Sequence, residues 1–519
     1  MVQRADTGRR NPLRRKRRAA AILLACTAIG QPMPLLAQTL SPSTTRPALA
    51  LGSNPQSATS QTRNIYSDPT VDPYATDSQA DAADGTGNRS TAVTTGVSGS
   101  GSSDPILEGR VVSNADDQIE SRQNPKEPSI DGASGIRSND GDTAAGIRLG
   151  TFVLRPSVSQ SINSEPTRTK GFGGDNERRS FLETGVRGTL DSDWSRHALK
   201  ITGEGLWQKN IGGTGETDPS VRLDADLQLD ISHDTTAHIT GGYRFSREDT
   251  TDPNAILGAE DQAGVNQFSS GASIERDFGI LRGLAAVNLD RSTYTSVRLS
   301  DGSTLSLADR NQTTAGARAR LGYELSPALI PFLELHAARS FYDQKRDSSG
   351  YARSSDTYGG KIGVEVDLGE KLRGELGIGY EKVAYDDSRL ASIGTVTADG
   401  SITWSPLRGT DVNLGLQTTV EDSTTPGLSG SIAYTLLGGV QHDLGHDILA
   451  RLTASTTLRD YPSGSGITDT TSYAAGAGLT WGISRYLDMT GDLAYELSGA
   501  SSGADTQKLR IGLGLQLKR

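Results

Sequence analysis

The chain has 519 residues, of which 34% are hydrophobic and 22% are charged, and its formal net charge is −10. An acidic chain disfavours nucleic acid as a partner. Because it contains a single cysteine, no internal disulfide can stabilise it.

The first 37 residues have the pattern of a secretory signal peptide. Eight Lys/Arg residues occur by position 18, followed by the apolar run Ala19–Ile29. This run is too short to span a bilayer, and we expect cleavage after Ala37. Cleavage there removes eight basic residues and one acidic residue, so the net charge moves from −10 to −17. In an alternative reading, Leu23-Leu24-Ala25-Cys26 is a lipoprotein box and Cys26 is lipidated.

Residues 38–145 are rich in Ser, Thr, Gly, Asp, Asn and Pro, and their apolar residues show no period. Such a segment buries too little apolar surface to offset the entropy lost on ordering. We therefore expect a disordered periplasmic segment between the signal peptide (1–37) and a domain that spans 146–519. It acts as an unstructured spacer or, alternatively, as a tether for a partner.

The clearest pattern in the chain is a strict alternation over 221–246. In 221–231 every second residue is apolar and those between are polar or charged, and the alternation resumes over 236–246 after a turn at 232–235. Only a β-strand separates residues in this way. The apolar face of such a hairpin packs on a second sheet in a soluble protein, whereas in a transmembrane barrel it faces lipid.

The same period recurs from residue 146 to the end and predicts about eighteen strands, an even number. The expected strands are 147–160, 180–190, 197–207, 221–231, 236–246, 266–276, 281–294, 312–325, 330–342, 356–368, 371–385, 393–404, 411–421, 430–443, 448–459, 472–483, 487–496 and 509–517.

The connections between these strands alternate in length. Long polar segments, such as 161–179, 208–220, 247–264 and 295–311, alternate with tight turns such as 232–235 and 369–370. An outer-membrane barrel with both termini in the periplasm requires this alternation, and a soluble sandwich does not. The low apolar content and the absence of helix-period stretches also favour a closed barrel over a packed soluble core.

Aromatic residues gather near the expected strand ends, where an amphipathic ring is stable at the lipid headgroups. Two girdles are predicted. The residues chosen for them are Trp194, Trp207, Tyr243, Phe245, Trp404 and Trp481.

Three stretches carry a resemblance to a known family: Gly146–Ser157, Leu199–Gly205 and Trp404-Ser405-Pro406. With them, residues 146–519 resemble the outer-membrane β-barrel porins of proteobacteria, some of which are linked to exopolysaccharide export. The resemblance implies a porin or a polysaccharide outlet. The chain departs from the usual pattern at its end, where Arg519 stands in place of an aromatic residue read by the assembly machinery.

The search for catalytic motifs gives little. Gly499–Gly503 has the form of a nucleophile elbow but lacks the strand-to-helix turn that this motif needs. His442 and His446 have helix-type metal spacing, but they lie on a strand and its following turn and do not converge. We therefore expect no enzyme activity, no cofactor and no metal site.

The fold class predicted is all-β: a transmembrane antiparallel β-barrel of about eighteen strands, preceded by a signal peptide and a disordered segment. Alternation selects polar residues of mixed sign as lumen-lining: Arg222, Asp224, Asp226, Asp230, Arg244, Asn288, Arg318, Arg320, Arg373, Asp411, Asn413 and Arg510.

The expected function is a porin-like outer-membrane channel for hydrophilic solutes, which a long loop such as 247–264 narrows if it folds inward. The alternatives are an outlet for exopolysaccharide secretion and a structural or adhesive surface protein anchored by its barrel. The expected partners are outer-membrane lipid and lipopolysaccharide, the outer-membrane assembly machinery, and hydrophilic solutes or polysaccharide. The sequence leaves the oligomeric state open.

Overall fold

The computed structural model describes residues 146–519, except for 171–175, 214, 216, 249–253, 257–258, 463–464, 466 and 501–504. The expected signal peptide and disordered segment lie outside the described residues.

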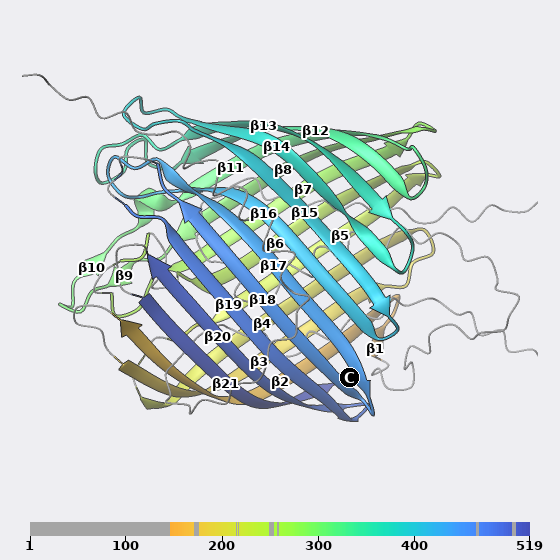
Figure 1. The fold of residues 1–519 in the computed structure, drawn as a ribbon, viewed down its shortest axis with the longest axis horizontal. Helices are drawn as coiled ribbons and strands as arrows, with labels where there is room; N and C mark the ends of the chain where they lie inside the picture. Colours follow the sequence, from red (N-terminus) through yellow and green to blue (C-terminus); the bar gives the residue numbers. More distant parts are fainter. Residues whose placement is uncertain are drawn as a thin grey trace, which may run out of the picture. The chain divides into compact units, whose positions relative to one another are not determined.

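Most of the described chain forms one antiparallel sheet that closes on itself (Figure 1), and a separate two-stranded sheet lies in one connection. The sheet has nineteen strands, and all but the short β1 (Ile147–Leu149) form the barrel, in which each strand pairs with the next one in the chain and β21 pairs back to β2. The barrel strands are β2 (Phe152–Lys170), β3 (Asn176–Ser192), β4 (His197–Gly213), β5 (Ser220–Ser232), β6 (Thr235–Arg247), β7 (Gly264–Asp277), β8 (Leu281–Tyr294), β11 (Gln312–Tyr323), β12 (Leu329–Tyr342), β13 (Ser355–Asp367), β14 (Leu372–Tyr385), β15 (Ile393–Leu407), β16 (Thr410–Asp422), β17 (Gly430–Gly445), β18 (Ile448–Asp460), β19 (Thr470–Ser484), β20 (Leu487–Ala500) and β21 (Asp505–Lys518).

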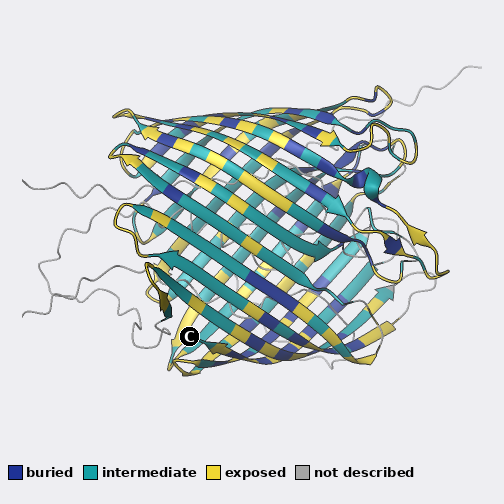
Figure 2. Ribbon diagram, turned by 180° about the vertical axis from the view of Figure 1, so that it is seen from behind, coloured by how far each residue is buried: buried dark blue, intermediate teal, exposed yellow. Residues whose placement is uncertain are grey.

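Closure follows from the alternation in the sequence. Most large hydrophobic residues of the strands point outward, as at Leu223 (47% exposed) and Leu289 (50% exposed), while their polar neighbours point inward. A few, such as Phe181 and Phe332, are buried. Figure 2 shows the resulting bands of exposed residues on the outer surface. A hydrophobic exterior and a polar interior suit a barrel that is surrounded by lipid. Because the barrel is closed, it has no strand edge with unpaired backbone groups.

The prediction of eighteen barrel strands is confirmed, and the hairpin at 221–246 becomes β5 and β6, with Leu227 opposite Ile239. The expected long connection 161–179 is wrong, because β2 reaches Lys170 and β3 begins at Asn176. Alternate residues there, such as Ser161 and Asn163, are polar because they face the interior. The first expected strand is also divided by a turn at Gly150, and β4 extends to Gly213.

The two ends of the barrel differ. One end carries tight turns, such as the one at His446 and Asp447, which both adopt positive φ (55° and 60°) after Gly445. The described N-terminal strand β1 and the end of β21 lie at this end (Figure 1). The other end carries the long connections, including the hairpin of β9 (Val297–Arg298) and β10 (Thr304–Leu305) and the short 3-10 helix η3 (Ala308–Arg310).

Within the described part of the chain, no helix has both the length and the apolar character needed to cross a membrane.

Candidate functional site: the barrel interior and its mouth

The structure places the residues predicted to line the lumen on barrel strands, at positions that alternate with outward-facing hydrophobic residues. Four lie on β5, two on β11 and two on β16, and the others are on β6, β8, β14 and β21. Arg318 and Arg510 are buried, and the others that we predicted are buried to an intermediate degree or, like Arg320, nearly buried. That they line the path of a solute stays a prediction.

On β5 and β6 the inward side chains pair with their neighbours. Arg222 contacts Asp224, and the Nδ1 atom of His238 lies 3.0 Å from Asp226 Oδ1. His238 is an interior residue that the prediction missed, although the period of β6 places it on the same face as Arg244. Arg222 and Asp224 therefore neutralise each other, and His238 supplies a hydrogen-bond partner for Asp226.

A larger charged cluster spans β11 to β15. Arg320 donates from Nε to Glu334 Oε2 (2.7 Å) and from Nη1 to Glu375 Oε2 (2.6 Å). Lys361 Nζ lies 3.4 Å from Glu334 Oε1 and 3.3 Å from Asp399 Oδ2. The prediction included Arg320 but missed its partners, which the two-residue period could have identified. Charged hydrogen bonds of this kind hold the wall strands in register.

Five of the residues predicted for the girdles lie within a few positions of a strand end, whereas Trp207 lies six positions before the end of β4. The four tryptophans Trp194, Trp207, Trp404 and Trp481 are between 39% and 54% exposed. Trp194 packs on Phe152, and Tyr243 packs on Phe268. Phe245 lies on the outward face of β6 and is half-buried. A position at the headgroup level stays a prediction for each of these rings.

The long connections fold together rather than standing apart. The described residues of 248–263, which are 248, 254–256 and 259–263, share a small apolar core with 295–311. The core consists of Ala263, Val297 and Leu307, with Ile256 and Leu299 packed against it. We call these two segments the cap. Because the cap has its own core, it has a definite structure beyond the ladder of the barrel.

A buried ion pair joins the two parts of the cap. Arg310 Nη1 lies 3.2 Å from Glu248 Oε1, and its Nη2 donates to the backbone oxygen of Asn254 (2.9 Å). Burial raises the pKa of the Glu248 carboxyl to about 7, although Arg310 acts in the opposite direction. The loss of hydration destabilises the charged carboxylate more than the interaction with Arg310 stabilises it.

The tip of the cap reaches a connection that follows it by about 170 positions. Asn254 Nδ2 donates to the backbone oxygen of Asp422 (3.2 Å), and Asn254 Oδ1 accepts from the backbone nitrogen and the hydroxyl of Thr424 (2.9 and 3.0 Å). Seven strand-to-strand steps in the barrel order separate β7 from β16, about two fifths of the circumference. The cap therefore crosses the mouth.

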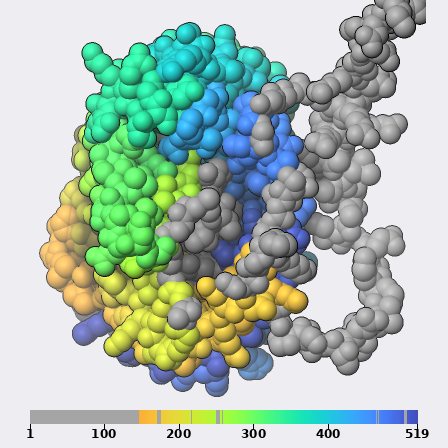
Figure 3. Space-filling model, turned by 90° about the vertical axis from the view of Figure 1, so that its left-hand side faces the viewer, coloured from red at the N-terminus to blue at the C-terminus, as the bar shows by residue number. Residues whose placement is uncertain are grey.

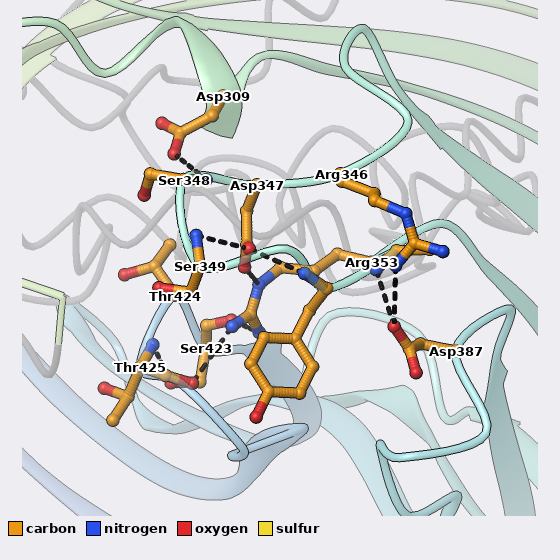
Figure 4. Close-up of polar contacts among 12 residues, drawn as sticks. Asp309, Arg346, Asp347, Ser348, Ser349, Arg353, Asp387, Ser423, Thr424 and Thr425 are labelled. Carbon is orange, nitrogen blue, oxygen red and sulfur yellow. Dashed lines mark hydrogen bonds and ion pairs between the residues drawn. The ribbon is translucent and has the colours of Figure 1, made fainter.

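The neighbouring connections complete this network (Figure 4). Asp309 of the cap accepts from the backbone of Ser348 in 343–354 (3.1 Å). The buried Arg353 contacts Asp347 and donates to the backbone oxygens of Thr425 and Leu428 (both 3.0 Å). Figure 3 looks onto this end, where the green cap segment and the blue-green segment next to it project side by side.

The carboxylate of Asp387 holds the connection 386–392 against the connection 343–354. Asp387 accepts from Arg389 and from the backbone nitrogen of Ala352 (3.0 Å). The bond from the Arg389 guanidinium, followed by that from the Ala352 backbone, lowers the pKa of the Asp387 carboxyl below its ordinary value. This carboxylate therefore stays ionised and keeps the connections 343–354 and 386–392 together.

The residues considered for catalysis or metal binding lie at separate places on the barrel strands and turns. His442 is bonded to Thr410 on β16 (2.7 Å), and His446 lies in the turn after β17. Among the described residues, no group of three or more His, Cys, Asp or Glu side chains is placed to hold a metal. Of Gly499–Gly503, only the first two residues are described, and they end β20.

The barrel is closed, has eighteen strands, and combines a polar, charge-paired interior with a hydrophobic exterior. These features define a porin-like channel of the outer membrane. The chain belongs to the family described as "Putative beta-barrel porin 2", whose model matches residues 142–519. The proteins of this family are described as porins, which are channels rather than enzymes.

Several solved structures are similar to the chain. OpdQ of Pseudomonas aeruginosa is 11% identical, with a TM-score of 0.35, over 70% of this chain and 98% of its own. OpdL of the same organism is 13% identical, with a TM-score of 0.34, over 70% of this chain and 99% of its own. OccAB4 of Acinetobacter baumannii is 9% identical, with a TM-score of 0.35, over 70% and 98%. No curated protein matches the chain at a significant level.

Proposed function

We propose that the protein is a passive channel for small hydrophilic solutes and that the cap and its neighbouring connections narrow its outer mouth. The observation that carries this proposal is the inner wall. Charged groups of both signs face the interior and are paired there, as in the cluster of Arg320, Glu334, Glu375 and Lys361. A wall of paired charges hydrates a pore without selecting strongly for ions of one sign.

The crossing of the mouth by the cap supports the second part of the proposal. Asn254 joins the cap to Asp422 and Thr424, and Arg353 ties 343–354 to 423–429. A solute that enters from this end has to pass beside these segments. We therefore expect a smaller conductance than the eighteen-strand wall alone allows.

The orientation in the membrane is part of the same proposal. The end with tight turns, where the described termini lie, faces the periplasm, and the cap faces outward. The girdle rings contact lipid and lipopolysaccharide at the two interfaces. The assembly machinery of the outer membrane inserts the chain and recognises a last strand whose outward residues Leu513, Leu515 and Leu517 are apolar.

Reconstitution tests the proposal. The purified, heat-modifiable protein is placed in planar bilayers and in liposomes, and conductance and sugar-driven swelling are measured. We expect stepwise conductance with weak ion selectivity, and swelling rates that fall with the size of the sugar. Silence in repeated reconstitutions of folded protein overturns the channel and favours a barrel that only anchors its connections.

A further inference from the structure

The pairing between β15 and β16 is incomplete in the half of these strands that lies nearer the cap. We call the cap side of these strands their upper end. Backbone pairing runs from Leu407 opposite Thr410 to Gly400 opposite Leu416, where the ladder stops. Both strands continue: β15 stays paired with β14 up to Ile393, and β16 stays paired with β17 up to Asp422. Over 393–399 and 417–422 the backbone ladder therefore joins β15 only to β14, and β16 only to β17. We call this part of the wall the seam.

Side chains close the seam in place of the backbone ladder. The hydroxyl of Thr418 accepts from the backbone nitrogen of Ala398 (2.9 Å) and donates to its oxygen (3.1 Å). The backbone nitrogen of Thr418 donates to Asp399 Oδ1 (3.1 Å), and the hydroxyls of Thr395 and Tyr434 lie 3.0 Å apart. A side-chain bond breaks with a rotamer change, whereas a ladder bond breaks only when backbone moves.

The cap occupies the upper end of the seam. The backbone oxygen of Asp422 lies on the edge of β16, and it accepts from Asn254 of the cap. The carboxylate of the same residue accepts from Tyr342 (3.3 Å) and Tyr385 (3.0 Å). Movement of the cap therefore frees this edge.

The seam carries charged groups, such as Asp399 and Glu421, which pair with Lys361 and Arg459. It also holds a cluster of apolar residues. Val383, Ile393 and Val420 form a buried cluster, with Tyr385 and Ile432 packed against it. On the outer face of β15, Val396 is 57% exposed and faces lipid. An opening of the seam exposes this buried apolar cluster to the bilayer.

We propose that the seam is a lateral gate through which an amphipathic molecule with an acyl tail passes between the barrel interior and the bilayer. A hydrophilic solute gains nothing by leaving water through an apolar gap, whereas an acyl chain stays in apolar surroundings on both sides. The polar head of such a molecule meets Asp422 and the two tyrosine hydroxyls at the upper end. This route adds to the solute channel and does not depend on it.

Cross-linking across the seam tests this proposal. In a Cys26→Ser background, which removes the single cysteine of the chain, Thr397→Cys and Thr419→Cys are joined by a short bismaleimide to lock the seam. The matched control joins Ser401→Cys to Gly415→Cys, which are partners in the intact ladder of the same two strands. A photoreactive p-benzoylphenylalanine at Val383 reports from inside the barrel, and one at Thr314, on the inner face of β11, serves as a distant reference.

The probe is alkyne-tagged palmitic acid, which is incorporated into membranes that contain the folded protein. We expect capture at position 383 and none above background at 314. The seam cross-link reduces capture at least tenfold, whereas the control cross-link leaves it unchanged. Equal capture in the locked barrel, or no more capture at 383 than at 314, overturns the gate. Ion conductance is measured on the same variants, so loss of the solute channel is distinguished from loss of the gate.

Discussion

Arg510 and Glu183 are 327 positions apart in the chain, yet Arg510 Nη2 donates to Glu183 Oε2 at 2.6 Å with both side chains fully buried. Arg510 lies on β21 and Glu183 on β3, and between them runs β2, whose Asn163 accepts from Arg510 Nε (3.2 Å). The bond therefore spans the place where the barrel closes.

Loss of one partner of this pair leaves a buried charge without compensation. We expect Arg510→Met to lower the free energy of unfolding by about 3–5 kcal/mol. The double variant Arg510→Met with Glu183→Met removes both charges and loses much less stability. Urea unfolding in lipid vesicles, followed by tryptophan fluorescence, measures both. If the double variant is as unstable as Arg510→Met alone, the pair does not act through its buried charges.

Neighbouring positions on β5 test the two faces of the wall. Leu227 lies on the outward face and Gln228 on the inward face, where its amide donates to Asp230 (2.8 Å). Leu227→Arg places a charge in lipid and should cost about 2–4 kcal/mol at the bilayer midplane. Gln228→Arg meets the carboxylates of Asp226 and Asp230 and should be tolerated. The same unfolding assay compares them, and equal tolerance contradicts the assignment of faces.

The crossing of the mouth by the cap predicts a change in conductance. Asn254→Ala removes the side-chain bonds to Asp422 and Thr424. Each bond contributes about 1 kcal/mol net, so the ratio of open to closed cap rises about fivefold for each one lost. We expect larger or longer openings in planar bilayers. Ser303→Ala, in the same cap, keeps the backbone turn to Asp301 and is the matched control. Identical traces for all three proteins contradict a closing role for Asn254.

The Glu248 carboxyl predicts a dependence on pH. Its pKa is raised from 4.5 to about 7 in the folded cap. Between these values the folded cap holds a proton that the unfolded cap has released, so the stability of the cap falls as pH rises through this window. Channels at pH 8 should therefore be open more often than channels at pH 5.

Glu248→Gln provides the control for this effect. The amide keeps the size of the carboxyl but does not titrate, and it leaves Arg310 charged at every pH. We expect the variant to show no difference in open fraction between pH 5 and pH 8 that stems from the cap. An undiminished pH response in Glu248→Gln assigns the effect to another group.

The wall could be predicted from the sequence because its rule is local. A strand such as β5 alternates strictly, since one face meets lipid and the other meets the interior, and each residue carries its own signal. The error at 161–179 has the same origin. Ser161, Asn163 and Glu165 are polar because they face inward, and a stretch of polar residues is typical of both a loop and the inner half of a strand.

The mouth and the seam could not be predicted in this way. The contact of Asn254 with Thr424 joins segments 170 positions apart, and no period links them. The sequence also carries no signal for the interrupted ladder between Gly400 and Ile393. Thr418 and Ala398 are ordinary strand residues, and their pairing depends on the neighbouring strands. Long-range contacts and register are set only when the barrel is complete.

The pairing of β21 with β2 also determines when the protein can become a membrane protein during its synthesis. Until Asp505–Lys518 has left the ribosome and been exported, the sheet has two open edges, and neither edge can be placed in hydrocarbon without leaving backbone groups unsatisfied. Insertion therefore waits for the last residues of the chain. A nonsense codon that removes only β21 should yield a periplasmic protease substrate in place of a narrower barrel.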